Sequence, residues 1–137
     1  MGLILDSSVL IAAERRPESI SILLRSIRET TGQTEVAISA ISVIELEHGV
    51  WRADTAERAA KRRLYLQEIY TAIRVEPFTR KMGALAAQID AEAKKTGKVI
   101  PFADLQIGVT AMQLGYSIAT HNLRHFAMIP GLVISHL

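Results

Sequence analysis

The stretch LILDSS, residues 3–8, decides which fold class we expect for this chain. Three apolar residues follow one another without alternation and stop at Asp6, after which come two small hydroxyl residues. A short apolar run of this kind is typical of a strand buried on both faces, as in the centre of a parallel sheet. Ligands of such sheets bind beyond the carboxyl ends of the strands, so Asp6 lies where we expect chemistry to occur.

The rest of the chain alternates between strand and helix patterns. This alternation favours an α/β fold in which a parallel sheet of four to five strands is covered by helices on both faces, giving three layers, α/β/α. No linker or repeat divides the sequence, so we expect one domain over residues 1–137. The predicted strands cover residues 3–5, 35–41, 73–75, 116–120 and 132–135, and the predicted helices cover residues 7–13, 18–29, 42–52, 54–70, 79–96 and 101–114.

Composition and charge exclude several classes of protein. Hydrophobic residues make up 49% of the 137 residues and charged residues 22%, as in a globular rather than a disordered chain. The net charge is only +2, so a nucleic-acid site has to come from local clusters of basic residues. The chain has no cysteine, which excludes disulfides and thiolate metal sites and suits a cytoplasmic location. We expect no signal peptide and no membrane span, because no basic start or long apolar stretch is present.

Three acidic residues lie beside the predicted ends of elements. Asp6 follows the first strand, Glu45 lies in the first turn of the helix after the second strand, and Asp104 lies in the first turn of the helix that leads to the fourth strand. In a parallel sheet these positions can face one crevice at the carboxyl edge. Carboxylates so close together repel one another unless a cation neutralises them, and Mg²⁺ or Mn²⁺ suits oxygen ligands. The spacing therefore suggests a metal site that activates water and stabilises charge on a phosphate.

Each of these acids can also have a purely structural role. Asp6, with the serine pair after it, can cap the following helix. Ser42-x-x-Glu45 has the pattern of a capping box, and Asp104 suits the positive end of a helix dipole. The residues alone leave both roles open for each acid.

Four motifs in order resemble those of the PIN-domain ribonucleases, and specifically of the VapC toxins of bacterial toxin–antitoxin pairs. The motifs are an acid after the first strand, a Glu within S-x-x-E-L, a P-x-x-D helix start and an A-T-x-N loop. They lie in the stretches LILDSSVLIA, SAISVIELEHGV and IPFADLQIGVTAMQLGYSIATHNLRHF, and the resemblance extends over essentially the whole chain.

The resemblance implies a set of site residues and a reaction. Asp6, Glu45 and Asp104 match the three principal acidic positions, with Asp6 and Asp104 as the usual metal-binding pair. Ser7 matches a small hydroxyl position beside the first acid, and Asn122 matches a polar residue in the loop after the fourth strand. The implied activity is Mg²⁺-dependent hydrolysis of RNA phosphodiesters, with Mn²⁺ able to substitute. Water would attack phosphorus in line and leave a 5′-phosphate and a 3′-hydroxyl.

The resemblance also implies protein partners. A VapB-type antitoxin would inhibit the nuclease by placing a helix or extended tail in a groove that the early helices help to form. A homodimer is expected on the same basis.

One position departs from the family pattern. Family members commonly carry an Asp just before the Phe of the last loop, and here that position is His125. We therefore expect one firmly held metal ion in the free protein and a second only with substrate phosphate. His121 and His125 are four residues apart, but no third ligand is spaced to complete a zinc site.

Basic residues provide candidates for RNA contacts. One group lies near the predicted active edge, namely Arg15, Arg16, His121 and Arg124. A second group shares one face of a predicted helix at spacings of three and four residues, and this face either holds RNA or is a solvated helix side. It consists of Arg58, Lys61, Arg62 and Tyr65.

An Asp at the end of a first strand is also compatible with functions besides a nuclease. A phosphoaspartyl hydrolase would usually need a second acid two residues later, where this chain has Ser8, and a receiver domain would need paired acids before its first helix. A further alternative is a degenerate PIN domain that acts as a non-catalytic RNA-binding or scaffold module, which His125 keeps open. Metal binding by the acids distinguishes the nuclease from the scaffold.

Overall fold

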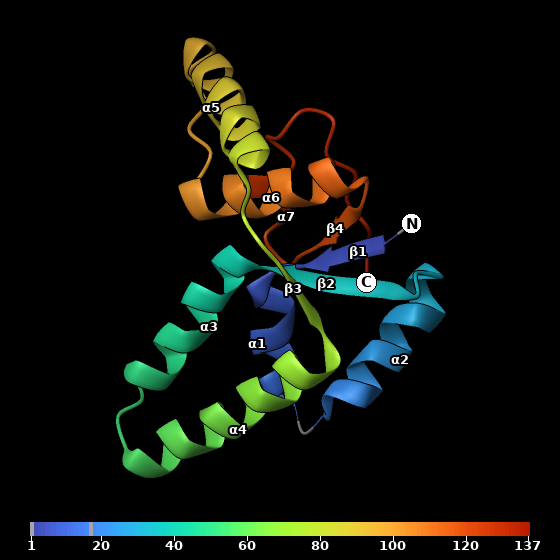
Figure 1. Cartoon of the computed structure of the whole chain (residues 1–137), viewed down its shortest axis with the longest axis vertical. Coiled ribbons are helices and arrows are strands. Elements are labelled where there is room, and N and C mark those ends of the chain that lie inside the picture. Colours follow the sequence, from blue (N-terminus) through green and yellow to red (C-terminus); the bar gives the residue numbers. More distant parts are fainter. Residues whose placement is uncertain (1, 17) are drawn as a thin grey trace.

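The computed structural model describes residues 2–16 and 18–137, in which four parallel strands form the central sheet (Figure 1). The strands are β1 (Gly2–Leu5), β2 (Glu35–Ser39), β3 (Arg74–Glu76) and β4 (Ser117–Ala119), arranged in the order β3-β2-β1-β4. β1 pairs with β2 on one side and with β4 on the other. The first strand is therefore inside the sheet, as its sequence predicts.

The apolar run of β1 is buried on both faces. Leu3, Ile4 and Leu5 are all 0% exposed. Successive side chains of a strand point to opposite faces, so Leu3 and Leu5 pack into one hydrophobic cluster and Ile4 into another. Two buried faces explain why the run does not alternate with polar residues.

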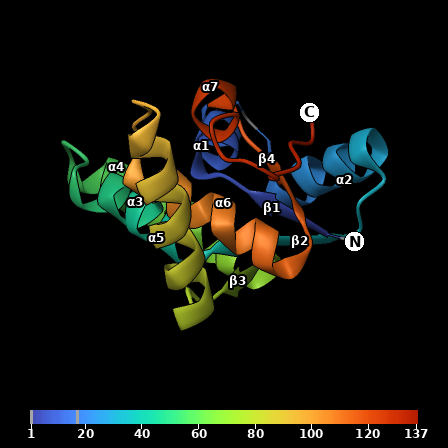
Figure 2. The same ribbon diagram turned by 90° about the horizontal axis from the view of Figure 1, so that it is seen from above.

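Helices form a layer on each side of the sheet, which confirms the predicted α/β/α architecture. Figure 1 shows the first four helices below the strands and the last three above them, and Figure 2 shows α5 and α6 lying over the sheet. No helix in the described ranges is both long and apolar enough to span a membrane. The lower layer contains α1 (Ser7–Arg15), α2 (Ile20–Thr31), α3 (Ala40–Trp51) and α4 (Ala56–Ala72), and the upper layer contains α5 (Arg80–Lys95), α6 (Phe102–Leu114) and α7 (Leu123–Phe126).

The boundary between β2 and α3 differs from the prediction. The strand ends at Ser39 and the helix begins at Ala40, whereas the apolar pattern predicts a strand over residues 35–41. Ser39 caps the helix, because its Oγ accepts a hydrogen bond from the backbone N of Ile41 at 3.1 Å. The apolar residues that extend the strand pattern therefore belong to the first turn of the helix.

The predicted fifth strand over residues 132–135 is only a bridge. Ile134 pairs with Ile118 in a single parallel bridge. Ile118 N donates to Val133 O at 2.9 Å, and Ser135 N donates to Ile118 O at 2.8 Å. The described sheet thus has four strands, the lower of the two predicted numbers.

Candidate active site

Asp6 lies at the carboxyl end of the central strand and is 1% exposed. Its backbone N donates to Ala119 O at 2.9 Å, so the ladder between β1 and β4 positions it. Asp6 is the N-cap residue of α1 but makes no side-chain capping hydrogen bond, and Ser7 and Ser8 lie within the helix. The interpretation of the Asp6 carboxylate as a helix cap is therefore wrong.

Two hydroxyl groups hold the Asp6 carboxylate. Ser8 Oγ donates to Asp6 Oδ2 at 2.7 Å, and Thr120 Oγ1 donates to the same oxygen at 2.8 Å. Each hydroxyl also accepts a backbone hydrogen bond from the loop after β4, Ser8 Oγ from His121 N at 3.0 Å and Thr120 Oγ1 from Asn122 N at 2.9 Å. The carboxylate and the loop therefore fix each other's positions.

Asp104 lies in the first turn of α6 and is 7% exposed. Its Oδ2 is 2.7 Å from His125 Nδ1. Burial raises the pKa of Asp104, the bond to His125 opposes this rise, and the negative charge of Asp6 adds to it. Asp6 and Asp104 are therefore close enough for the charge of one to disfavour ionisation of the other.

Glu45 projects from α3, and the interpretation of it as part of a capping box is wrong. Ser39 caps this helix, while Ser42 lies within it. Glu45 Oε1 is buried and has no hydrogen-bond partner among the described residues. Burial raises the pKa of Glu45, the charges of Asp6 and Asp104 raise it further, and the Ser7 hydroxyl lowers it.

The three predicted acids thus influence one another from three different elements. Asp6 comes from the end of β1, Glu45 from α3 and Asp104 from α6. Each of Glu45 and Asp104 is a stronger base than an exposed carboxylate, because burial and neighbouring negative charge both disfavour ionisation. Such a cluster can accept protons or bind a cation.

The oxygen atoms of this cluster suit Mg²⁺, although they are not a closed cage. No three His, Cys, Asp or Glu side chains within residues 2–16 and 18–137 are grouped closely enough to hold a metal by themselves. No hydrogen bond within those residues reaches Oδ1 of Asp6 or Asp104, and Glu45 Oε1 is also without a partner. Mg²⁺ is usually bound by one or two carboxylates, with water and substrate phosphate supplying the other ligands. The donor set therefore fits this ion.

The other predicted site residues are distributed around the acids. Ser7 is buried beside Glu45, and Asn122 is exposed and contacts Thr120 through its backbone. Of the four predicted RNA contacts, Arg15 lines a cavity together with Glu45. Arg16 and His121 line a different cavity, next to α2, and Arg124 is exposed on α7.

The predicted basic face of α4 is divided by its contacts. Arg58 forms an exposed ion pair with Asp54 at 2.9 Å. Arg62 and Tyr65 instead point into the protein, where Arg62 Nη1 donates to Gly49 O at 2.6 Å and Tyr65 OH donates to a carbonyl of α1 at 2.8 Å. The interpretation as a wholly solvated helix side is therefore wrong for these two residues.

Sequence reasoning missed Ser8 and Thr120 as partners of Asp6. Their hydroxyls contact the carboxylate directly, yet Thr120 is 114 residues away from it in sequence. Thr120 belongs to the A-T-x-N motif, which is the one signal that could have identified it.

The chain is similar to known proteins in sequence and in fold. The chain is 29% identical to ribonuclease VapC1 of Rickettsia felis, over 98% of this chain and 95% of that protein. It also superposes on a chain in the crystal structure of VapBC2 from Rickettsia felis bound to a promoter DNA fragment. The TM-score is 0.84 and the sequence identity is 22%, over 100% of this chain and 99% of the other.

A second solved structure has the same fold. It is VapBC-5 from Mycobacterium tuberculosis, a member of the VapBC family of toxin–antitoxin systems, with a TM-score of 0.73 and 20% identity over 100% of this chain and 98% of the other. A family model described as PIN domain matches residues 3–132.

Proposed function

Because this chain belongs to the PIN domain family, we propose that it is a VapC-type endoribonuclease, the toxin of a toxin–antitoxin pair, which hydrolyses RNA phosphodiester bonds with the help of a divalent metal ion. The observation that carries the proposal is the cluster of Asp6, Glu45 and Asp104 at the carboxyl edge of the sheet. Ribonuclease VapC1, a relative similar over nearly the whole length of both chains, supports RNA as the substrate.

Asp6 and Asp104 are the proposed ligands of Mg²⁺ or Mn²⁺. Ser8 and Thr120 orient Asp6 through Oδ2, which leaves its Oδ1 to face the ion. His125 orients Asp104 in the same manner. Partners behind a ligand fix its direction and contribute to affinity. When bound, the ion supplies positive charge that stabilises the phosphate and lowers the pKa of water.

Glu45 is the proposed general base. Its raised pKa, caused first by burial, makes its carboxylate a better proton acceptor at neutral pH than an exposed glutamate. Oε1, which lacks a partner among the described residues, is the atom that would accept the proton of the attacking water. Water as nucleophile does not need the ribose 2′-hydroxyl, so the products would carry 5′-phosphate and 3′-hydroxyl ends.

The proposed protein partners are a VapB-type antitoxin, which inhibits the nuclease, and a second copy of this chain. The solved relatives described as VapBC complexes support the antitoxin. Arg15, Arg16, His121 and Arg124 are proposed to contact RNA phosphates. Since the substrate is cellular RNA, the proposal places the protein in the cytoplasm.

A second candidate function is supported by His125. Its contact with Asp104 occupies an oxygen of one proposed metal ligand. A PIN domain that bound RNA without cleaving it would not need the acid that family members commonly carry at the position of His125. The two candidates differ in whether metal-dependent hydrolysis occurs.

Cleavage of total cellular RNA by the purified, antitoxin-free protein tests the proposal. Reactions would contain Mg²⁺ or Mn²⁺, with EDTA and Asp6→Asn as controls. We expect discrete fragments with 5′-phosphates that disappear with either control. If the wild-type protein gives no metal-dependent fragments, the nuclease proposal is wrong and the binding module is favoured.

A further inference from the structure

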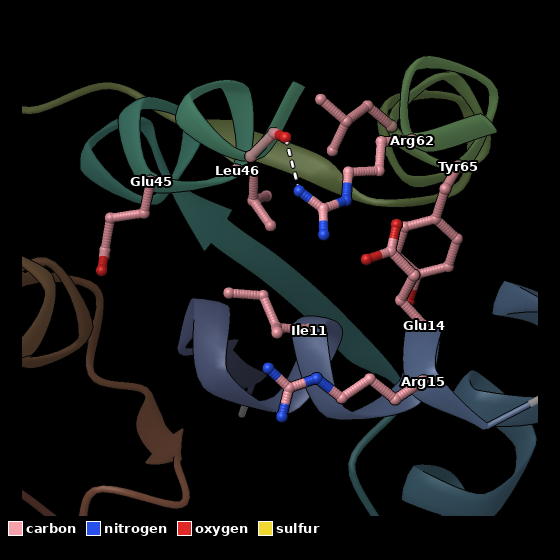
Figure 3. Close-up of a pocket in the computed structure, with 9 residues that line it drawn as sticks. Ile11, Glu14, Arg15, Glu45, Leu46, Arg62 and Tyr65 are labelled. Carbon is pink, nitrogen blue, oxygen red and sulfur yellow. Dashed lines mark hydrogen bonds between the residues drawn. The ribbon is translucent and has the colours of Figure 1, made fainter. Parts of the chain in front are cut away.

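A cavity of about 150 Å³ opens beside Glu45, between α1, α3 and α4. Figure 3 shows Arg62 and Tyr65 reaching into it from α4, Glu14 and Arg15 on α1 across from them, and Glu45 at one end. It continues outward into a larger cavity of about 590 Å³, because Glu14, Arg15, Arg62 and Tyr65 line both. The proposed general base is therefore at the inner end of a cleft that leads to the surface.

Arg62 presents a preoriented guanidinium to this cleft. Its Nη1 donates to Gly49 O at 2.6 Å, the bond that is dashed in Figure 3. No hydrogen bond or ion pair within residues 2–16 and 18–137 uses its Nε or Nη2. These two nitrogens form one edge of the planar guanidinium, and such an edge suits a ligand with two neighbouring acceptors.

Tyr65 supplies a fixed aromatic wall. Its OH donates to Leu10 O at 2.8 Å, so the ring cannot swing out of the cleft without losing that bond. Burial, with the nearby charge of Glu14, raises the pKa of Tyr65 to about 12, so the phenol keeps its proton at neutral pH. Ile11, Leu46 and Leu66 complete the apolar lining.

The charges of the cleft balance one another, so its interior as a whole does not attract an anion. Two cations, Arg15 and Arg62, are balanced by two carboxylates, Glu14 and Glu45. A neutral ring that carries both acceptors and donors matches this mixture. The cavity of about 150 Å³ is large enough for a benzene-sized ring, and the adjoining cavity of about 590 Å³ gives room for the second ring of a purine. Unpaired RNA bases are recognised in this manner, by aromatic stacking and by hydrogen bonds to their edges.

We propose that this cleft is a base-binding subsite, which takes a guanine of single-stranded RNA next to the scissile phosphate. The free edge of Arg62 would donate to O6 and N7 of guanine, and Glu14 would accept from its N1–H and N2–H groups. Adenine has an amino group in place of O6, which would meet the donors of Arg62. This inference rests on the proposed RNA substrate and adds a preference for one base.

Binding of short RNAs to the cleavage-deficient Asp6→Asn protein tests the subsite without relying on catalysis. The probes are fluorescent oligouridines that carry one guanine, adenine or 7-deazaguanine, and the readout is anisotropy. We expect guanine to bind about 5- to 150-fold more tightly than adenine, the range for a bidentate arginine contact. 7-Deazaguanine, which lacks N7, should bind several-fold more weakly than guanine.

Arg62→Ala in the same background should abolish the difference between guanine and 7-deazaguanine and should reduce the difference between guanine and adenine to the part that Glu14 contributes. Arg62→Lys keeps the charge but not the planar edge, so it should weaken the preference for guanine over 7-deazaguanine while still binding RNA. Arg63→Ala is the matched control, because Arg63 is on the same helix but lies over the Trp51 ring, 5.9 Å from its centroid. It should keep the preference.

Three results would overturn the subsite. If the Asp6→Asn protein binds all three probes equally, the cleft has no base preference. Equal weakening of every probe by Arg62→Ala would make Arg62 a general contact. A loss of antitoxin binding in Arg62→Ala with unchanged RNA affinities would make the cleft a peptide groove. Failure of the nuclease proposal is distinguishable, since it concerns cleavage by the wild-type protein, whereas these measurements concern only binding.

Discussion

The buried carboxylate of Glu45 opposes folding at neutral pH when no metal is present. The pKa of Glu45 is raised above its usual value of 4.5, chiefly by burial, so the folded state binds this proton more tightly than the unfolded chain does. Stability is therefore lost as the pH rises from about 4.5 through the raised pKa, and the whole penalty is present above it. The buried position of Glu45 therefore lowers the stability of the metal-free protein at neutral pH and is explained by a functional role.

Glu45→Gln should accordingly raise the melting temperature at pH 7 in EDTA by a few degrees, because glutamine carries no charge to bury. The difference from the wild type should shrink as the pH is lowered towards 4.5, where the glutamate becomes protonated. Differential scanning calorimetry over this pH range measures both effects. Glu29→Gln, a change at an exposed position of α2, provides the control. If Glu45→Gln is less stable than the wild type at pH 7, the buried charge of Glu45 does not oppose folding.

Thr120 provides a second test at the level of single side chains. Thr120→Val keeps the shape but removes the hydroxyl that donates to Asp6 Oδ2 and accepts from Asn122 N. Loss of such a supporting partner typically lowers metal affinity or activity about 10- to 100-fold. Mn²⁺ titration and RNA cleavage would measure these losses, and Thr120→Ser should restore most of both. Unchanged metal affinity in the valine variant would show that the hydroxyl does not orient Asp6.

The sequence identified the acids of this cluster but not the groups that hold them. Asp6 follows a strand and Asp104 lies in the first turn of a helix, and both positions are visible in a single sequence. The prediction that Glu45 lies in a first turn is wrong, because α3 begins at Ala40 and places Glu45 in the second turn. Ser8 and Thr120 were missed, because a hydroxyl pattern beside a helix start is equally typical of a local cap. Their actual role depends on a contact between distant parts of the chain, which no local pattern contains.

Among the elements, the junction of β2 and α3 best illustrates where boundaries are hard to predict. Alanine and isoleucine continue the apolar pattern beyond Ser39, and neither residue type excludes a strand or a helix. The side chain of Ser39 decides the boundary by accepting the hydrogen bond from Ile41 N. In contrast, the spacing of apolar residues and the positions of turn residues in the sequence predict the two helical layers and most helix positions correctly.

Ser39→Ala should therefore destabilise the fold by about 0.5–2 kcal/mol, the usual cost of losing an N-cap. Ser39 is 0% exposed and its Oγ also lies 3.4 Å from Thr110 Oγ1 of α6, so the upper part of that range is expected. Urea unfolding measures the change. Ser26→Ala, at an exposed position within α2, should leave stability nearly unchanged. A similar result for both variants would mean that Ser39 does not cap α3.

At the level of the whole molecule, the acid cluster lies where the two helical layers meet at the sheet edge. Glu45 comes from the lower layer, Asp104 from the upper layer and Asp6 from the strand between them. An ion held by acids from both layers would link them, and its binding energy would add to the free energy of unfolding.

Mn²⁺ at about 100 times its dissociation constant should raise the melting temperature of the wild-type protein by roughly 5–10 °C. Asp6→Asn should lose most of this shift, because one of the two proposed ligands is gone. Asp90→Asn, which removes a surface acid paired with Lys94 at 3.0 Å, should retain it. Equal shifts in all three proteins would mean that the ion binds elsewhere.

The pairing of β1 with both β2 and β4 has a consequence for how the protein is made. Ribosomes release a chain from its N-terminus, so Asp6 emerges first, whereas Thr120 is synthesised 114 residues later. Until then the central strand lacks one neighbour, and Asp104 has not met His125. The nascent polypeptide therefore cannot assemble the carboxylate cluster with its supporting partners until the segment through His125 has been translated. For a proposed RNA-cutting toxin, this topology delays harmful activity until the loop after β4 has been made.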